Sequence, residues 1–233
     1  MLREAIEELR AGRPVLIFDS SDREGETDIV FASQFASMES IRFMRKTGGG
    51  LICTTMREKD AGVIGLPFLE DLYSKHLGLG QKVTDASDLK YDVSSSFSVT
   101  INHRSTFTGI PDRDRSLTIR AFASYLKELP AYGTSATEIF AREFRIPGHV
   151  ILLIARDGYF RVRRGHTELS TYLVEKAGLI PSATIVEMLD DNGYSLSHES
   201  AAKFAEDYKL TFIEGKNIID EWIDDQSNGY GSF

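Results

Sequence analysis

An acidic loop between two apolar runs holds the first residues that could carry chemistry. Residues 19–28 place five carboxylates and one guanidinium within ten positions, between the apolar runs 15–18 and 29–32. Apolar runs of this length, bounded by turn residues, predict buried strands that hold the loop in place. Carboxylates at this density suit a hard cation such as magnesium, although most charge runs are simply solvated loops. The loop is therefore a candidate metal site that needs further ligands from elsewhere in the chain.

Residues 163–167 form a second candidate site, where an expected strand ends and a helix begins. Unpaired backbone N–H groups at a helix N-terminus attract phosphate, and Arg163 and Thr167 would add a guanidinium fork and a hydroxyl. The alternative is that Thr167 only caps the helix while the arginines lie in solvent. His166 could ligate a metal at the same place, although a single histidine is more often structural. The segment therefore predicts either a phosphate and metal site or an ordinary helix start.

Three further residues stand out singly. Glu187 interrupts the apolar run 183–189, and a carboxylate on a buried strand needs a partner, a proton or a metal. Burial would move its pKa towards the working range of a general acid or base, unless the residue faces solvent. His149 follows a Pro-Gly pair just before an apolar run, a position that suits acid–base chemistry or a structural histidine. Cys53, the single cysteine, most simply fills a small buried apolar space.

Composition limits the classes of function. The chain has 233 residues, 42% of them hydrophobic, which allows one substantial core. Its 27 basic and 35 acidic residues give a net charge of −8, which argues against a broad nucleic-acid or anionic-membrane surface. A single cysteine excludes an intrachain disulfide and a four-cysteine zinc site. The amphipathic start 1–9 is no signal peptide and no apolar run could span a bilayer, so we expect a cytoplasmic protein without nucleic-acid or membrane partners.

Apolar periodicity and turn signals predict the elements that position these residues. We expect helices at 2–9, after Ser37 or Ser40, and at 117–126, 164–177, 197–208 and 216–223. We expect strands at 15–18, 29–32, 51–55, 97–101, 150–154, 159–163, 183–189 and 210–213. Residues 69–96 are irregular and either cover the site or hide further structure. The interleaved order predicts one α/β (α+β) domain over 1–233, a mixed sheet sandwiched by helices, with a disordered tail at 226–233.

Taken together, these segments resemble the 3,4-dihydroxy-2-butanone 4-phosphate synthase family of riboflavin biosynthesis. The resemblance runs from about Val15 to Glu187. Each motif alone is weak, but several motifs in the same order are specific. The matching motifs are the acidic loop 19–28, the glycine-rich turn 48–50 before Cys53, Thr108-Gly109-Ile110 with Asp114-Arg115, Pro147-Gly148-His149, Gly165-His166-Thr167, and Glu187.

The resemblance implies a lyase that converts D-ribulose 5-phosphate to L-3,4-dihydroxy-2-butanone 4-phosphate and formate. Enolisation, dehydration, skeletal rearrangement and formate release each require a proton to be moved, and a divalent cation stabilises the developing negative charge. The family uses magnesium or manganese, with two ions per site, and no organic cofactor. It forms homodimers with sites at the subunit interface, so His149 could act on the site of the other subunit.

The family's functional residues carry over onto matching positions. Glu24 and His166 would bind the metal, and His149 and Glu187 would transfer protons. Asp19 and Cys53 could line the pocket. The resemblance also implies a set of substrate-binding residues, with Arg23 and Asp28 on the hydroxyls, Arg163, Thr167 and Thr108 on the phosphate, and Glu24, Arg164, Gly165, His166 and Glu187 around them.

This sequence departs from the family pattern at several positions. Ser20, Ser21 and Gly25 replace acidic residues and asparagine, Thr27 replaces a glycine, and Arg164 replaces a glycine common beside the histidine. The chain has neither the length nor the cysteines of the form fused to GTP cyclohydrolase, so we expect a monofunctional enzyme. Two alternatives remain open. One is a metal-dependent sugar-phosphate isomerase or aldolase, which would release no formate, and the other is a non-catalytic metal- or phosphate-binding module.

Overall fold

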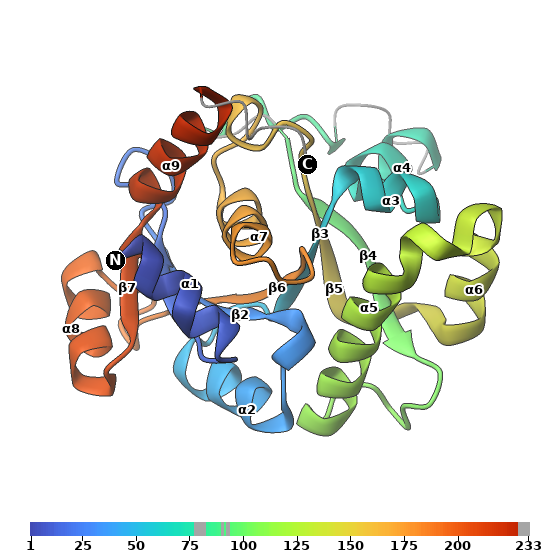
Figure 1. Cartoon of the computed structure of the whole chain (residues 1–233), viewed down its shortest axis with the longest axis horizontal. Helices are drawn as coiled ribbons and strands as arrows, with labels where there is room; N and C mark the ends of the chain where they lie inside the picture. The colour runs from blue at the N-terminus through green and yellow to red at the C-terminus, as the bar shows by residue number, and fades with distance from the viewer. Residues whose placement is uncertain (77–82, 90, 92–93, 228–233) are drawn as a thin grey trace.

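A seven-stranded mixed sheet forms the centre of the molecule, in the strand order β4-β5-β3-β6-β2-β1-β7 (Figure 1). The computed structural model describes residues 1–76, 83–89, 91 and 94–227. The β1–β7 and β3–β5 pairs are parallel, and the other neighbouring pairs are antiparallel. The predicted mixed sheet is thus confirmed. Its strands are β1 (Val15–Phe18), β2 (Thr27–Ala32), β3 (Cys53–Arg57), β4 (Phe97–His103), β5 (Phe144–Ala155), β6 (Ala183–Glu187) and β7 (Thr211–Glu214).

Helices cover both faces of this sheet. α2, α3, α5, α6 and α8 contribute side chains to one hydrophobic core, and α1, α7 and α9 contribute to the other. In Figure 1, α7 lies in front of the sheet, beside α1 and α9. The helices are α1 (Leu2–Arg10), α2 (Met38–Thr47), α3 (Glu58–Ile64), α4 (Leu69–His76), α5 (Asp112–Tyr132), α6 (Ala136–Glu143), α7 (His166–Lys176), α8 (His198–Tyr208) and α9 (Gly215–Ser227).

Strand β1 separates the two cores. Leu16 packs into the core on the side of α2 and α5, whereas Val15 and Ile17 pack into the core on the side of α1 and α7. Successive side chains of a strand point to opposite faces, so a strand that is apolar throughout must be covered on both sides. Every residue of β1 is buried. The acidic loop therefore starts from a rigid support.

Some elements differ from the sequence prediction. Residues 159–163 form no strand, because Gly158 (φ 81°) and Tyr159 (φ 44°) turn the chain into the short 3₁₀ helix η4 (Tyr159–Arg161). The helix α5 continues past Pro130, since its buried apolar face outweighs the one backbone hydrogen bond lost at proline. The irregular segment 69–96 begins with the helix α4. The predicted tail is wrong for 226 and 227, which continue α9, and 228–233 lie outside the described residues.

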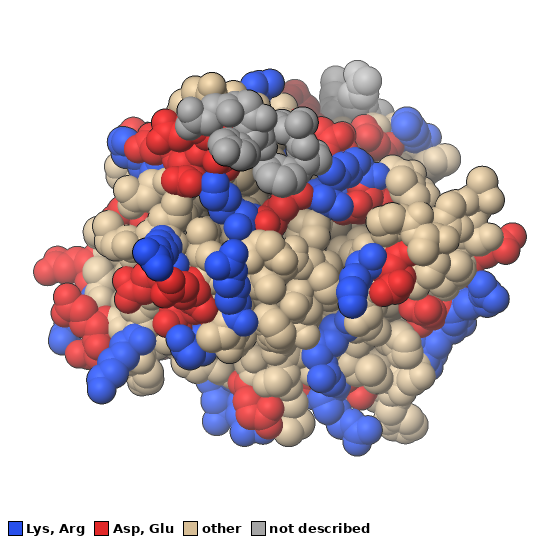
Figure 2. All heavy atoms as spheres, in the orientation of Figure 1, with Lys and Arg blue, Asp and Glu red and all other residues tan. Residues whose placement is uncertain are grey.

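Charged side chains of both signs lie on the face of the molecule drawn in Figure 2. On the face drawn in Figure 2, lysine and arginine are interspersed with aspartate and glutamate. A clustered basic face is the usual electrostatic footprint of a nucleic-acid-binding protein, and the mixture in Figure 2 fits the net charge of −8 instead. Within the described part of the chain, no helix combines the length and the apolar character needed to cross a membrane.

Candidate active site

Asp19 organises the acidic loop that follows β1. Its Oδ2 accepts hydrogen bonds from the Glu24 backbone N–H at 3.1 Å and from Arg23 Nη1 at 3.0 Å, and its Oδ1 accepts one from the Glu26 N–H at 3.0 Å. Asp19 is only 4% exposed. A buried guanidinium and backbone N–H groups thus offset part of the carboxylate repulsion. These contacts fix the backbone from which Glu24 projects.

Glu24 and His166 lie together where the loop meets the start of α7. His166 Nδ1 is 3.5 Å from Glu24 Oε2, and His166 Nε2 is 3.2 Å from the carbonyl oxygen of Ile17. A carbonyl oxygen can only accept, so Nε2 carries a proton and Nδ1 is the atom that neutral His166 offers to a cation. Asp19, Glu24 and His166 can each bring one ligand atom within 4.8 Å of the other two. This donor set of two carboxylates and one imidazole fits a divalent metal.

The charges around His166 influence one another strongly. Burial lowers the pKa of His166, but the carboxylates of Asp28 and Glu24 outweigh burial and raise the pKa to about 9. Burial raises the pKa of Glu24, but the hydrogen bond with His166 and the charge of Arg23 bring that pKa down to about 2. Protonated His166 therefore supplies positive charge among the acids. A divalent cation can take this place only when His166 gives up its proton.

Asp28 and Glu187 face each other on neighbouring strands. They are register partners in the antiparallel β2–β6 pair, so their side chains lie on the same face. Burial raises the pKa of Asp28, which His166 opposes and Glu187 reinforces, and the resulting pKa is about 8. Asp28 Oδ1 lies 3.7 Å from His166 Nε2 and, among the described residues, is buried without a hydrogen-bond partner. A buried carboxylate oxygen without a hydrogen-bond donor needs a proton or a cation to offset the cost of burial. The position of Asp28 Oδ1 therefore also fits a metal site.

The glycine-rich turn 48–50 holds Glu187 in place. The Leu51 backbone N–H donates a hydrogen bond to Glu187 Oε2 at 2.8 Å, and the Gly50 N–H donates to the Glu187 carbonyl oxygen at 3.2 Å. A Cβ atom added at Gly50 would lie 2.2 Å from Glu187 Oε2. Only glycine allows the backbone to approach a side chain so closely. The turn is therefore a support of the site and not a flexible linker.

Gly165 lets two guanidinium groups approach the start of α7. A Cβ atom at Gly165 would lie 2.1 Å from Arg163 Nη1 and 2.7 Å from Arg23 Nη2. Arg163 Nη1 also donates to Glu168 Oε2 at 2.8 Å, and Glu168 is fully buried. Two guanidinium groups beside the N–H groups of a helix N-terminus make a favourable place for a phosphate.

A cavity of about 240 Å³ joins these groups. Ala86, Leu89 and Tyr91 form part of its wall, so a piece of the irregular segment lines the site. Cys53 also lines it, and burial raises the pKa of its thiol well above the usual value, which keeps the sulfur neutral. The predicted site residues in the described lining are Glu24, Asp28, Cys53, Arg163, His166, Thr167 and Glu187.

Four predicted residues near this cavity do not belong to its described lining, namely Asp19, Arg23, Arg164 and Gly165. Asp19 is buried under the acidic loop and uses its oxygens there. Arg164 is exposed, and its Nε donates to the carbonyl oxygen of Phe160 at 3.4 Å. The Arg164 side chain is therefore held against the η4 turn and does not belong to the described lining of the cavity.

His149 and Thr108 form a separate group around Asn102. The His149 N–H donates to Asn102 Oδ1 at 2.9 Å, so Asn102 Nδ2 is the atom that faces His149 Nδ1 at 3.0 Å. His149 Nδ1 therefore accepts a hydrogen bond, and the imidazole proton of the neutral ring is on Nε2. Asn102 Nδ2 also lies 3.3 Å from the Thr108 carbonyl oxygen. His149 is exposed, four residues along β5 from the cavity residue Leu153, or about 13 Å.

Sequence reasoning missed two supporting residues, Asn102 and Glu168, and it singled out the turn that contains Gly50 without predicting its contact with Glu187. Asn102 positions His149, Glu168 holds Arg163, and Gly50 makes room for Glu187. The signals were weak in each case. Glu168 gave a weak signal because an acidic residue in the first turn of a helix commonly interacts with the helix dipole. Asn102 gave a weak signal because an amide on a strand has no distinctive sequence spacing. Their contacts join residues that are distant in the sequence, and such pairs leave no local pattern.

Known proteins resemble this chain over most of its length. A family model described as 3,4-dihydroxy-2-butanone 4-phosphate synthase matches residues 3–221. The enzyme of that name from Archaeoglobus fulgidus is 45% identical over 94% of this chain and 92% of its own, and that from Methanothermobacter thermautotrophicus is 41% identical over 97% and 98%. A solved 3,4-dihydroxy-2-butanone 4-phosphate synthase in complex with two magnesium ions is 25% identical, with a TM-score of 0.76 over 98% of both chains. The chain therefore belongs to the 3,4-dihydroxy-2-butanone 4-phosphate synthase family.

Proposed function

We propose that this protein converts D-ribulose 5-phosphate to L-3,4-dihydroxy-2-butanone 4-phosphate and formate, as a lyase of riboflavin biosynthesis. The family membership supports the reaction. The observation that carries the proposal is one cavity shared by Glu24 and His166, by Asp28 and Glu187, and by Arg163. A phosphorylated ketose needs these three kinds of group: a cation site for its oxygens, acids or bases for its protons, and a cationic place for its phosphate.

Glu24 and His166 would hold a divalent metal, with Asp19 and Asp28 close by. A bound cation stabilises the negative charge that develops on the substrate oxygens when a proton is lost beside the ketone. Magnesium or manganese suits the donors, and the two magnesium ions of the related structure support a pair of ions. The chain's own contribution is orientation. The Ile17 carbonyl fixes the tautomer of His166, and Asp19 fixes the loop that carries Glu24.

Arg163 and Thr167 would bind the phosphate, together with the N–H groups at the start of α7. Arg23 would lie between the phosphate and the substrate hydroxyls, since Gly165 allows both guanidinium groups to approach one place. The phosphate takes no part in bond breaking. Its binding energy would hold the reacting carbons beside Glu187.

Glu187 and His149 would move the protons. Glu187 is anchored by the Leu51 N–H, so one carboxylate oxygen is fixed while the rest of the group reaches the cavity beside Asp28. His149 carries its neutral-ring proton on Nε2, where it can donate to a substrate oxygen. Within one chain, the described lining of the cavity does not include His149 or Thr108. Each would have to reach a site on another chain.

We further propose a homodimer in which His149 and Thr108 complete the site of the other subunit. Large apolar side chains lie exposed close to these two residues in the sequence. Phe107 is 95% exposed, and Ile110 and Ile146 are each 52% exposed. Large apolar side chains gathered on one surface commonly mark a protein interface. A dimer would cover them and bring His149 of the partner subunit to the acidic cavity.

The remaining features fit a small enzyme of the cell interior. The shared sheet and the helices on both of its faces support one domain over 1–233. The single cysteine is buried, which is compatible with the reducing cytoplasm as the compartment. Cys53 would serve as a neutral wall of the cavity and not as a nucleophile.

Formate release tests the proposed reaction. Purified protein with magnesium and ribulose 5-phosphate should release formate, a chelator should stop it, and Glu24→Gln should lower the rate by at least about 100-fold. The variant should keep the circular dichroism spectrum of the parent. An isomerised sugar phosphate or shorter fragments without formate would identify an isomerase or aldolase instead. Binding of the sugar phosphate without any turnover would identify a non-catalytic module.

A further inference from the structure

Residue 156, directly after β5, lies between two carboxylates that each use both of their oxygens. Glu168 Oε1 accepts a hydrogen bond from the Arg156 backbone N–H at 3.1 Å, and Glu168 Oε2 accepts one from Arg163 Nη1 at 2.8 Å. Glu70 Oε1 accepts from Arg156 Nη2 at 2.9 Å, and Glu70 Oε2 accepts from the Ser95 backbone N–H at 3.1 Å. Residue 156 therefore connects α7, which carries Glu168, with α4, which carries Glu70.

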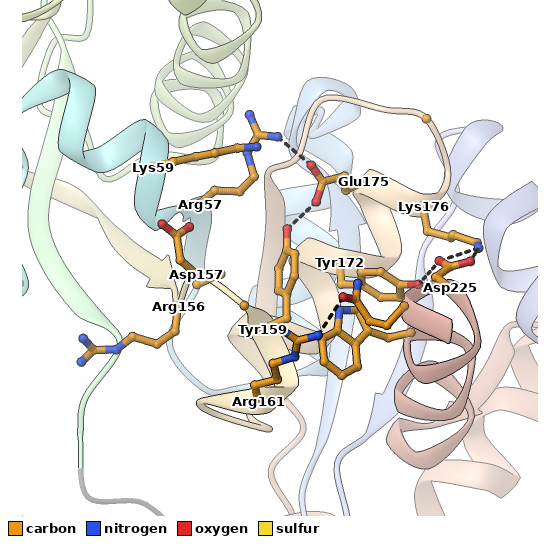
Figure 3. A pocket seen from close by; sticks show the side chains of 15 residues that line it. Arg57, Lys59, Arg156, Asp157, Tyr159, Arg161, Tyr172, Glu175, Lys176 and Asp225 are labelled. Atoms are coloured by element: carbon orange, nitrogen blue, oxygen red, sulfur yellow. Dashed lines mark hydrogen bonds and ion pairs between the residues drawn. The ribbon is translucent and has the colours of Figure 1, made fainter. Parts of the chain in front are cut away.

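The Arg156 guanidinium completes the hold on Ser95. Its Nη2 also donates to the Ser95 carbonyl oxygen at 3.2 Å, so one ion pair binds both the N–H and the C=O of that residue. The central guanidinium carbon lies 3.5 Å from the centre of the Phe68 ring, a stacking contact that suits a planar cation. In Figure 3, the Arg156 side chain extends away from Arg57 and Glu175, which form an ion pair of their own.

Both ends of this chain of contacts lie in the wall of the candidate active site. Arg163 lines the cavity as a proposed phosphate ligand, and Ser95 and Ser96 line the same cavity. The Ile154 N–H donates to the Ser96 carbonyl oxygen at 2.8 Å, which ties this stretch to β5 as well. The described lining does not include Arg156, so this residue can influence a ligand only through the groups that it holds.

Glu168 is more than a favourable charge at the start of a helix. An acid that served only the helix dipole could stay at the surface, whereas Glu168 has no exposed area. Burial of a carboxylate is costly unless donors and a positive charge compensate it. Arg163 supplies the charge, and each oxygen has a donor of its own. Glutamine offers only one acceptor oxygen and cannot serve both donors.

We propose that Glu168, Arg156 and Glu70 are positioning residues for the phosphate end of the candidate active site. Glu168 sets the direction of the Arg163 guanidinium. The pair of Arg156 and Glu70 sets the Ser95 backbone in the wall, and the common attachment at residue 156 fixes these two parts of the cavity relative to each other. The inference rests on the phosphate-binding role proposed for Arg163, and it does not depend on which bonds the enzyme breaks.

Phosphate binding without turnover tests the inference. Inorganic phosphate is titrated by calorimetry into the full-length protein in the presence of magnesium. Glu168→Gln should weaken phosphate affinity by about tenfold. Glu70→Gln and Arg156→Lys should each weaken it by about threefold, and the two changes together by no more than either alone, since both remove one contact. Asp60→Asn is the matched control, because Asp60 is a buried acid paired with Arg57 at 2.7 Å, and neither residue belongs to the described lining of this cavity.

Formate release supplies a second measurement. In Glu168→Gln, KM for ribulose 5-phosphate should rise by about tenfold and kcat should change less than KM, because the phosphate is bound away from the breaking bonds. The double variant Glu168→Gln/Arg163→Lys should have the KM of Arg163→Lys alone, because Glu168 acts through Arg163. A purely structural role would instead add a separate loss.

Three results would overturn the inference. The first is a parent protein that binds no phosphate at millimolar concentration, or a folded Glu168→Gln protein with the phosphate affinity of the parent. The second is equal weakening in Asp60→Asn, which would indicate a general effect of removing a buried acid. The third is an additive loss in the double variant with Arg163→Lys. If Glu168→Gln does not fold, Glu70→Gln and Arg156→Lys test the same junction. A parent that releases no formate would refute the proposed reaction, and the phosphate titrations would still decide the inference.

Discussion

Gly50 sets the position of Glu187, and replacing it with alanine should disable the site while the fold survives. The added Cβ would lie 2.2 Å from Glu187 Oε2 and 2.8 Å from Glu187 Cβ. Real Cβ contacts of this kind are rarely shorter than about 3.4 Å, so the carboxylate has to swing away and the turn at residue 50 has to shift from Glu187 Cβ. The swing breaks the 2.8 Å hydrogen bond from the Leu51 N–H. The backbone at Gly50 has no positive φ, so the substitution acts through Glu187 and not through backbone strain.

The expected size follows from the proton-transfer role proposed for Glu187. A positioned general acid or base contributes about 10²–10⁴-fold to a rate, so Gly50→Ala should lower kcat by at least about 100-fold. Crowding of a packed interior costs about 1–3 kcal/mol of unfolding free energy, which leaves the protein folded. Formate release gives the rate, and urea unfolding followed by circular dichroism gives the stability. Magnesium binding should persist, because Glu24 and His166 are unchanged.

Gly62→Ala is the matched control. A Cβ there meets nothing within 4 Å, and the residue lies inside α3 with no positive φ. Alanine should raise the unfolding free energy by about 0.5–1 kcal/mol and leave kcat unchanged. The double variant Gly50→Ala/Glu187→Gln should be no slower than Glu187→Gln alone, since both changes remove the same function. A folded Gly50→Ala protein with the kcat of the parent would refute the assignment of Glu187.

Three further predictions follow from the site. A cation competes with the proton on His166, whose pKa is about 9. Magnesium affinity measured by calorimetry should therefore rise by about tenfold per pH unit from pH 7 towards 9. A constant affinity over this range would contradict the metal assignment. Arg163→Lys keeps the charge but loses the guanidinium fork, so KM for ribulose 5-phosphate should rise by about tenfold, and an unchanged KM would remove Arg163 from the phosphate site. Asn102→Ala removes the hydrogen bond that orients the His149 ring, so kcat should fall by about tenfold and the pH profile of kcat should shift. Magnesium affinity measured by calorimetry should be unchanged. A loss of metal binding would mean that Asn102 supports the whole fold.

The sequence predicted the turn at 19–28 and the helix start near residue 166 because both signals are local, but the strand expected to lead into 163–167 is the 3₁₀ helix η4. The acidic loop lies between two buried strands, and the 163–167 segment coincides with the start of α7. The mixed sheet followed from strands and helices of ordinary pattern. The structure then brings Glu24 and His166 together although they lie far apart in the chain. Only the resemblance to a known family had linked the two segments beforehand.

Contacts without a local signature were beyond the sequence. The η4 turn depends on Tyr159 at positive φ, which a hairpin signal does not reveal. The close approach of Gly50 and Glu187 joins residues on different elements. The sequence of a glycine-rich turn does not show which distant residue the turn will contact. The place of His149 is the clearest case. Its motif matched the family, yet along β5 it lies about 13 Å from the nearest cavity residue on its own strand.

The most direct measurement of the central claim, that two chains build each site, is activity in a mixed dimer. Glu24→Gln and His149→Ala are each inactive as homodimers by this proposal. Co-expressed at equal levels, half of the dimers would be mixed, and each mixed dimer would contain one intact site out of two. The mixture should therefore release formate at about a quarter of the parent rate. A mixture as inactive as its components, with mixed dimers present by mass spectrometry, would contradict a site shared between subunits.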